Sequence, residues 1–456
     1  MPERSLRFDI AEVKRGLRAS ACPGLFRMVP ARDGGICRVK IPLGELSAAK
    51  ARAIAQAAVR FGNGRVEATN RANLQLRGIR PADETALIEF LLDADFGPTR
   101  PEADDIRNVM TNPTAGIDRA QDLDARPLAR ALLAHLESDN ACRALSAKFG
   151  ILVDGGEAVA IVDHPHDIWV ASMDGGARWA LGVAGSPPTR SDDRTPFIAV
   201  LPDRAVAAIA TLLALFLDAA AGDPAITRMR HLVARASRRD VLDRLSEKLG
   251  ETGATIETWR RRVPARLGHV GITEQRQAGF AFVGAVPPLG RLAPDVLMGL
   301  ADVAEEMGDG SVRLTPWQSL ILPMIATKNA SEVAAILQSL GLYCDASQPL
   351  AAMVACAGSP GCISGLADAK ADALALAQAL GNSPGRVHVT GCAKSCASIR
   401  VADVTLLALA PGTYELFVKA ADAPSKFGRS IARDVGVDEA AARIRALKAG
   451  ASEGQG

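Results

Sequence analysis

The stretch from Cys356 to Cys396 reads Cys-Ala-Gly-Ser-Pro-Gly-Cys at 356–362 and, 28 residues later, Gly-Cys-Ala-Lys-Ser-Cys at 391–396. It holds four of the eight cysteines of the chain within 41 residues. A cubane iron–sulfur cluster needs four thiolates that converge on one point, and two short cysteine pairs on separate loops supply them. The glycines around these cysteines let the backbone approach a cluster and aim N–H groups at its sulfur atoms.

Zinc, a disulfide and unrelated core cysteines are the alternatives. Zinc sites usually have closer pairs, so a Cys-x5-Cys pair is unusual for zinc. Nothing marks the chain as secreted, which argues against a disulfide, and four unrelated cysteines would have to gather by chance among Gly and Pro. The pattern therefore predicts a [4Fe–4S] site with the ligands Cys356, Cys362, Cys392 and Cys396. Buried core positions are expected for the others, which are Cys22, Cys37, Cys142 and Cys344.

The composition is that of a globular protein of about two to four domains. The 456 residues are 48% hydrophobic and carry a net charge of only +2, which argues against a polyanionic partner. Aromatic residues make up 4% of the chain, too few for the stacking surfaces that bind single-stranded nucleic acid. We therefore expect no nucleic-acid partner.

The most apolar run, Ala205 to Leu217, spans 13 residues before Asp218. A membrane helix needs roughly 20 residues, so this run predicts a buried helix and no membrane association. The first nine residues lack the apolar core of a signal peptide. We expect a cytoplasmic protein, in which thiols stay reduced and able to bind metal.

The chain contains an internal repeat. A shift of 246 residues aligns 42–79 with 288–325 without a gap, and thirteen of the 38 positions are identical. Within the first copy, Ser47 is a plausible N-cap of a helix over 48–61, and 35–41 alternates like a strand. A period this long indicates a duplicated domain. Two such units are expected to pack as pseudo-twofold mates with a ligand pocket at their interface.

The two copies differ in chemistry after the helix. The first reads Thr-Asn-Arg-Ala-Asn-Leu-Gln-Leu-Arg at 69–77, and the second reads Thr-Pro-Trp-Gln-Ser-Leu-Ile-Leu-Pro at 315–323. The first copy keeps basic and amide side chains, whereas the second is largely apolar. We expect the first copy to line an anionic site and the second to support it.

The order Cys-x5-Cys…Gly-Cys-x3-Cys resembles the cluster motif of the sulfite and nitrite reductase family, and the duplicated plan is similar to that family over nearly the whole chain. The resemblance implies an α+β fold with a pseudo-twofold axis, two ferredoxin-like half-domains and two α/β domains of the cluster- and heme-binding type. It also implies that Cys396 contacts the iron when siroheme is bound. The expected units are 18–84 and 264–330 for the ferredoxin-like repeats, 97–240 for the first α/β domain and 345–447 for the [4Fe–4S]-binding domain.

Members of this family bind a tetrapyrrole that carries eight carboxylates, a task that suits Arg and Lys. The resemblance implies that matching positions in this chain bind the tetrapyrrole. These positions are Arg38, Lys40, Asn70, Arg71, Gln75, Arg77, Arg107 and Lys148.

Two positions depart from the reductases. Lys40 stands where arginine is usual, and Gly150 replaces the second lysine of a Lys-Phe-Lys triplet that begins at Lys148. The reductases use such cations to bind the oxyanion and to deliver protons. These departures argue against sulfite or nitrite reduction.

Within the family, Ala-Cys-Pro-Gly-Leu-Phe-Arg at 21–27 and Thr-Gly-Cys-Ala-Lys-Ser-Cys at 390–396 resemble the precorrin-3B synthases of aerobic cobalamin biosynthesis. This resemblance implies a monooxygenase that hydroxylates precorrin-3A at C20 and closes a γ-lactone, with O2 and electrons from NADH. The heme-type pocket would then hold the substrate. A siroheme-dependent sulfite or nitrite reductase is the second interpretation, and a non-catalytic iron–sulfur redox sensor or electron-transfer module is the third.

The electron source and a second metal also follow from the resemblance. No Gly-x-Gly-x-x-Gly follows a strand, so we expect electrons to arrive from a separate reductase or a ferredoxin. The family suggests a mononuclear non-heme iron, which usually takes two His and a carboxylate. The one local candidate, Asp-His-Pro-His-Asp at 163–167, also fits a polar turn before a strand over 168–172. The sequence assigns no catalytic residue.

Overall fold

The repeat forms two five-stranded antiparallel sheets. The computed structural model describes residues 8–453 except 19, 21, 163, 251–254, 383–384, 399, 421–422 and 424, with side chains to 447. The first sheet has the order β1 (Val29–Ala31), β2 (Gly34–Val39), β5 (Leu74–Ile79), β4 (Val66–Ala68) and β13 (Arg291–Leu292). The second has the order β11 (Gly271–Glu274), β12 (Phe280–Ala285), β15 (Leu320–Ala326), β14 (Ser311–Leu314) and β3 (Glu45–Ser47).

Each sheet takes its last strand from the other copy. Strand β13 pairs with β4, so that Arg291 lies opposite Glu67, and β3 pairs with β14, so that Glu45 lies opposite Arg313. These two pairs are equivalent under the 246-residue shift, with the charges exchanged. Neither sheet is therefore complete without the other copy.

Helices cover one side of these sheets. Helix α2 (Ala48–Phe61) has the bounds predicted from the sequence, and the Ser47 hydroxyl accepts a hydrogen bond from the Lys50 N–H at 3.3 Å, which confirms the N-cap. Its repeat mate, α8 (Pro294–Met307), packs against it. The second helices of the copies, α3 (Glu84–Asp93) and α9 (Ala330–Ser339), have the same 246-residue offset. A short helix, α1 (Ile10–Gly16), precedes the first copy.

Two further sheets form the α/β domains, and both have the same topology. Their first three strands are parallel and the last two antiparallel. The first sheet contains β6 (Val109–Thr111), β7 (Ile151–Asp154), β8 (His166–Met173), β9 (Arg178–Gly185) and β10 (Ile198–Val200). The second contains β16 (Met353–Ala355), β17 (Val387–Thr390), β18 (Val404–Ala410), β19 (Thr413–Val418) and β20 (Arg429–Val435).

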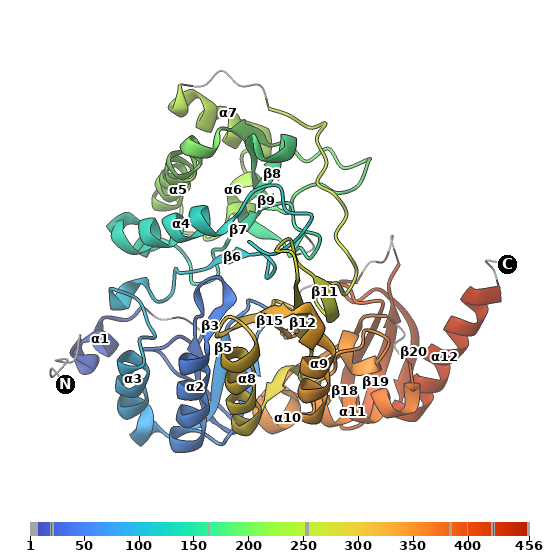
Figure 1. Ribbon diagram of the computed structural model, residues 1–456. Coiled ribbons are helices and arrows are strands. Elements are labelled where there is room, and N and C mark those ends of the chain that lie inside the picture. Colours follow the sequence, from blue (N-terminus) through green and yellow to red (C-terminus); the bar gives the residue numbers. More distant parts are fainter. Residues whose placement is uncertain are drawn as a thin grey trace.

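Helices complete both α/β domains. The first domain carries α4 (Arg126–Ser138), α5 (Ala205–Gly222), α6 (Met229–Val233) and α7 (Arg238–Leu249). The second carries α10 (Gly358–Gly361), α11 (Ala369–Leu380) and α12 (Val437–Glu453). Figure 1 shows the first α/β domain, in green, above the paired ferredoxin-like units, and the second, in orange and red, beside them. This duplicated α+β architecture confirms the expected fold class.

Helix α5 is the one helix of the described chain that is long and apolar enough to cross a membrane. One face of it, including Ile209, Leu212 and Phe216, lies in the hydrophobic core of the first α/β domain. This packing agrees with the buried helix predicted for the apolar run.

The exchanged strands make a testable prediction. Leu46 on β3 and its repeat mate Leu292 on β13 are 0% and 1% exposed. Truncation of either, Leu46→Ala or Leu292→Ala, should lower the free energy of unfolding by about 2–5 kcal/mol. Because the sheets share strands, both variants should keep a single unfolding transition for the two ferredoxin-like units, measured by denaturant titration.

The control is Leu374→Ala on α11, because Leu374 is 37% exposed. It should change the stability much less. Independent unfolding of the two repeats in either core variant would contradict the proposed dependence of one sheet on the other.

Candidate functional site

The four motif cysteines meet at one edge of the second α/β sheet. The first pair follows β16 and the second pair follows β17, and these neighbouring strands are parallel, so their carboxyl ends lie together. All four side chains line one cavity of about 720 Å³, here called the cluster cavity; they are Cys356, Cys362, Cys392 and Cys396. Burial and the charges of the other three motif thiols raise the pKa of Cys396.

The backbone around these cysteines fits a cluster. The Gly391 N–H donates to the Cys356 sulfur at 3.2 Å, the type of contact that tunes cluster sulfur ligands. Gly358 has φ of +66°, and a Cβ there would lie 2.6 Å from the Ala369 nitrogen. Gly365 packs so closely that a Cβ would lie 2.5 Å from the Gly358 carbonyl carbon. A [4Fe–4S] cluster held by these thiolates would supply single-electron transfer.

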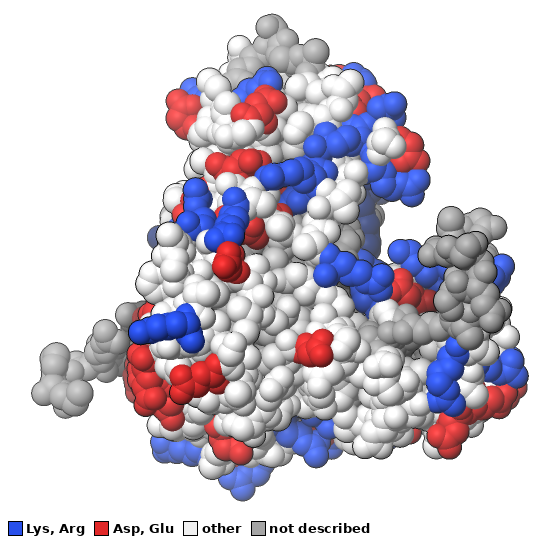
Figure 2. All heavy atoms as spheres, turned by 45° about the vertical axis from the view of Figure 1, so that its right-hand side comes forward, with Lys and Arg blue, Asp and Glu red and all other residues white. Residues whose placement is uncertain are grey.

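A second cavity of about 530 Å³ adjoins the cluster cavity and is here called the basic cavity. The two cavities share six lining residues, which are Pro23, Arg38, Thr69, Asn70, Lys394 and Cys396. Cys396 therefore lies at the boundary between the cysteine site and the basic cavity. In Figure 2 the surface is hollowed between the two α/β domains, and Lys and Arg side chains lie along this hollow.

Most of the predicted tetrapyrrole-binding residues line these cavities. Gln75 and Arg77 line the cluster cavity, and Arg38 and Asn70 line both cavities. The basic cavity also includes Arg71, Arg107 and Lys148. Lys40 lines neither cavity.

The side chains of the first repeat are aimed into the cavities by local contacts. With its amide oxygen turned toward Arg38, Gln75 accepts two hydrogen bonds from the guanidinium at 2.7 and 3.2 Å. The Asn70 amide donates to the Cys396 carbonyl at 3.5 Å. Burial and the charge of Arg38 lower the pKa of Arg71 to about 10. Such a concentration of positive charge favours an anionic ligand.

Lys40 instead links the first repeat to the first α/β domain, and the ion pairs of Arg107 lie within that domain. The Lys40 ammonium donates to the Asp105 carbonyl at 2.8 Å and to the Asn108 Oδ1 at 2.9 Å, and burial lowers its pKa to about 7. Arg107 lies 3.5 Å from Asp104 and 3.6 Å from Glu137. These contacts occupy Lys40 within the protein, while Arg107 presents part of its side chain to the basic cavity.

Arg77 connects the first repeat to the cysteine loop. Its guanidinium donates to both Asp33 carboxylate oxygens, at 2.8 and 2.9 Å, and to the Gly361 carbonyl at 2.8 Å. Gly361 directly precedes Cys362. Arg77 also lies 3.6 Å from Glu67, which accepts a hydrogen bond from Lys370 of α11 at 2.8 Å. The geometry thus makes Arg77 a positioning residue for this loop.

Family models account for most of the chain. The model of the nitrite/sulfite reductase ferredoxin-like half domain matches residues 29–94 and 273–340. The model of the nitrite and sulphite reductase 4Fe-4S domain matches residues 102–252, the first α/β domain. The chain belongs to the nitrite/sulfite reductase family. The four cysteines lie in the second α/β domain, which repeats the topology of the first.

Individual relatives have different activities. A ferredoxin–nitrite reductase of Synechococcus elongatus is 30% identical over 393 residues, which are 82% of this chain and 76% of that protein. A precorrin-3B synthase of Sinorhizobium sp is 28% identical over 417 residues, 90% of this chain and 84% of that protein. The NirA protein of Mycobacterium tuberculosis has the same fold, with a TM-score of 0.71 at 21% identity over 91% of this chain and 80% of its own. These relatives share one family, but their names give different substrates, so membership of the family does not by itself identify the substrate of this chain.

Some cavity residues of this family member are missed by sequence reasoning. The basic cavity is also lined by Cys22, Arg228 and Arg230, and both cavities by Lys394. Cys37, Cys142 and Cys344 are buried as expected, whereas Cys22 is only half-buried at the cavity wall. Arg228 and Arg230 lie far from every motif, and no local pattern distinguishes them from solvated arginines.

The predicted iron ligands are brought together only in part. His164 and His166 both line the basic cavity, with ring centroids 5.6 Å apart, and the His166 Nε2 lies 3.3 Å from the Met110 sulfur. The Asp167 carboxylate binds Arg228 at 2.9 Å and the Gly150 N–H at 2.9 Å. Asp163 lies outside the described residues.

Within the described chain, the one group of three potential ligands gathered within 4.8 Å is His135, Asp139 and Cys142, on and after α4. Burial raises the pKa of Cys142 to about 11, which disfavours the thiolate. The described residues therefore do not form a two-histidine, one-carboxylate iron site around His164 and His166.

The structure gives Gly150 a place in the wall of the basic cavity. A Cβ at Gly150 would lie 3.6 Å from the His166 ring and 3.7 Å from the Asn108 carbonyl, both ordinary contacts. The backbone at 150 therefore leaves room for a side chain, and position 150 itself contributes no cation to the cavity wall.

The position of Arg77 makes a testable prediction. Its side chain is 5% exposed, so Arg77→Gln removes the buried counter-charge of Asp33, while Glu67 keeps its ion pair with Lys370. We expect the free energy of unfolding to fall by about 3 kcal/mol, and the iron and sulfide content to fall because the loop before Cys362 is released. Denaturant unfolding and metal analysis measure both effects.

Arg80→Gln is the matched control, since the Arg80 side chain is 77% exposed and pairs only with nearby Asp83 within the described contacts. It should cost less than about 1 kcal/mol. If Arg77→Gln retained its cluster and stability as well as Arg80→Gln does, Arg77 would have no positioning role.

Proposed function

We propose that this redox enzyme of the nitrite/sulfite reductase family is a precorrin-3B synthase, which oxidises precorrin-3A at C20 and forms a γ-lactone. The observation that carries the proposal is the basic cavity beside Cys396, whose wall has glycine at 150. The cations suit a polycarboxylate tetrapyrrole, while the triplet lysine that the reductases use for oxyanion chemistry is missing. The relative from Sinorhizobium sp supports this choice, because it matches 90% of this chain.

The reaction balances with O2 and two electrons. Precorrin-3A, O2, NADH and a proton yield precorrin-3B, NAD+ and water. One oxygen atom enters the substrate and the other leaves as water, and NADH is the two-electron reductant. We expect a separate reductase or a ferredoxin to carry these electrons to the protein.

The residues of the chain itself bind and orient the substrate. Arg38, Arg71 and Lys148 lie on the wall of the basic cavity, where they can pair with substrate carboxylates. Asn70 lies between this wall and the Cys396 carbonyl. A tetrapyrrole in this cavity would lie beside the cysteine site, which favours electron transfer between the two.

A siroheme-dependent ferredoxin–nitrite or sulfite reductase is the second candidate. The observation that favours it is the 30% identity to the ferredoxin–nitrite reductase of Synechococcus elongatus. The same cavity would then hold siroheme as a cofactor. Gly150 argues against this candidate, because it removes a cation from the site at which an oxyanion would bind.

The deciding experiment is anaerobic purification followed by a visible spectrum, with iron, sulfide and extractable tetrapyrrole assayed on the same sample. About four sulfides, about four to five irons and no tetrapyrrole, together with O2-dependent conversion of added precorrin-3A, are the expected results. Bound siroheme with nitrite or sulfite turnover would refute the oxygenase and support the second candidate.

The cysteine ligands can be tested in parallel. Cys392→Ser and Cys396→Ser should each lose most of the iron and sulfide, since serine is a poor cluster ligand. Cys344→Ala, at a buried cysteine outside both cavities, should keep the wild-type content. Full iron and sulfide in both serine variants would exclude the cluster assignment.

A further inference from the structure

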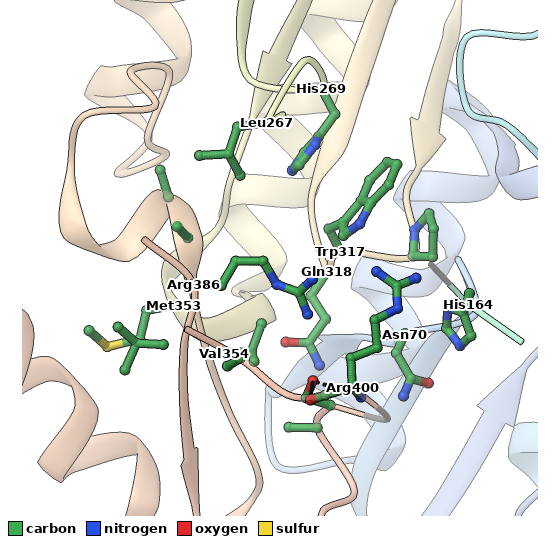
Figure 3. Close-up of a pocket in the computed structure, with 17 residues that line it drawn as sticks. Asn70, His164, Leu267, His269, Trp317, Gln318, Met353, Val354, Arg386 and Arg400 are labelled. Atoms are coloured by element: carbon green, nitrogen blue, oxygen red, sulfur yellow. Dashed lines mark hydrogen bonds between the residues drawn. The ribbon is translucent and has the colours of Figure 1, made fainter. Parts of the chain in front are cut away.

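A third, smaller cavity lies where the other two cavities meet, and it is here called the arginine pocket. Its volume is about 70 Å³. Figure 3 shows the side chains of Arg386 and Arg400 extending into it, toward the space between Gln318, Asn70 and the Trp317 ring. Neither arginine belongs to a motif that the proposed function uses.

The arginine pocket is the pseudo-twofold mate of the basic cavity. In the first α/β sheet Ile151 pairs with Ile168, and in the second Val387 pairs with Val404. Gly150 directly precedes Ile151, and Arg386 directly precedes the equivalent Val387. Gly150 and Arg386 are therefore equivalent positions.

A pair of hydrogen bonds confirms this equivalence. The Gly150 N–H donates to Asp167 Oδ2 at 2.9 Å, and the Arg386 N–H donates to Asp403 Oδ2 at 2.9 Å. Asp167 and Asp403 directly precede the paired residues Ile168 and Val404. The two sites therefore share one backbone framework.

Some cations stand at different equivalent positions in the two sites. His164 lies four residues before Ile168, and Arg400 lies four residues before the equivalent Val404. Arg400 therefore takes the place of a histidine. In the repeat, Trp317 takes the place of Arg71 under the 246-residue shift. The basic cavity takes cations from both the ferredoxin-like unit and the first α/β domain, whereas the arginine pocket takes its two arginines from the second α/β domain.

The arginine pocket opens toward both larger cavities. Asn70 lines all three, His164 also lines the basic cavity, and Gln318 and Ala397 also line the cluster cavity. A ligand that fills a larger cavity can thus extend one side arm into the pocket. The volume suits a single carboxylate and excludes a ring.

The pocket also has a positive field. Burial, followed by the charges of Arg71 and Arg386, lowers the pKa of His164 to about 4. Burial and Arg386 lower the pKa of His269, which stacks on Trp317 at 4.4 Å between ring centroids, to about 3. Both imidazoles are therefore neutral near pH 7, and the arginines carry the charge that would bind an anion.

We propose that Arg386 and Arg400 bind one peripheral carboxylate of the tetrapyrrole and so fix its rotation in the basic cavity. The inference rests on the proposed function for the identity of the ligand. A guanidinium binds a carboxylate through two parallel hydrogen bonds, which orients as well as holds it. A ring anchored at one arm presents one edge to Cys396, and a site-selective oxidation needs such an orientation.

The first test measures binding of uroporphyrin, a stable tetrapyrrole with eight carboxylates, to the cluster-containing protein by fluorescence titration. Arg386→Gln and Arg400→Gln should each raise the dissociation constant about tenfold, because a charge-assisted pair is lost. Arg386→Lys should recover part of the affinity. Arg65→Gln is the control, since Arg65 is exposed and lines none of the three cavities. Wild-type affinity in both glutamine variants would overturn the proposal.

The second test needs no variant. Phenylglyoxal modification of Arg386 and Arg400 in the wild-type protein, followed by mass spectrometry, should be suppressed by uroporphyrin and unaffected by sulfate. Suppression by sulfate alone would mean that the pocket binds a free oxyanion, and the proposal would be wrong. Modification at equal rates with and without uroporphyrin would also overturn it.

The two proposals fail in different ways. If the wild-type protein did not oxidise precorrin-3A, the proposed oxygenase activity would be refuted. Uroporphyrin binding that depends on Arg386 and Arg400 would still support the assignment of the pocket as a carboxylate site. If oxidation occurred while the glutamine variants kept the wild-type dissociation constant and KM, the pocket assignment alone would fail.

Discussion

The exchange of edge strands between the two ferredoxin-like sheets is the constraint on which the rest of the structure depends. Strand β3 completes the second sheet and β13 completes the first. If the two repeats separated, both sheets would expose an unpaired strand edge, and the cross-strand pairs Glu45–Arg313 and Arg291–Glu67 would be broken. The resulting rigid centre positions the turns after β4 and β14. Those turns supply Asn70 and Arg71 on one side and Trp317 and Gln318 on the other, and so determine where the cavities form.

A duplicated framework has produced two sites of different chemistry. The same backbone contact, from an N–H to an aspartate carboxylate, supports Gly150 in one half and Arg386 in the other. The half with glycine forms a cavity of about 530 Å³, and the half with arginine forms a pocket of about 70 Å³. Side-chain volume and charge at a few equivalent positions, rather than a change of fold, distinguish the larger cavity from the smaller pocket.

The cysteine site and the basic cavity share wall residues and are also connected by hydrogen bonds from the first repeat. Cys396 lies on the wall of both cavities, and the Asn70 amide of the first repeat donates to its carbonyl. On the opposite side Arg77 connects Asp33 to the Gly361 carbonyl. The first repeat therefore contacts both cysteine loops.

The sequence alone determined the duplication, the bounds of α2 with its Ser47 cap and the grouping of four cysteines, because these depend on local periodicity and short spacing, and the fold class followed from the resemblance to the sulfite and nitrite reductase family. It also indicated most of the cations that line the basic cavity. Only the tertiary structure decided that Lys40 is occupied by Asp105 and Asn108, and that Arg386 and Arg400 enter a pocket. Charged side chains look alike in a sequence, and their roles depend on which partners the folded chain brings within reach, often hundreds of residues away.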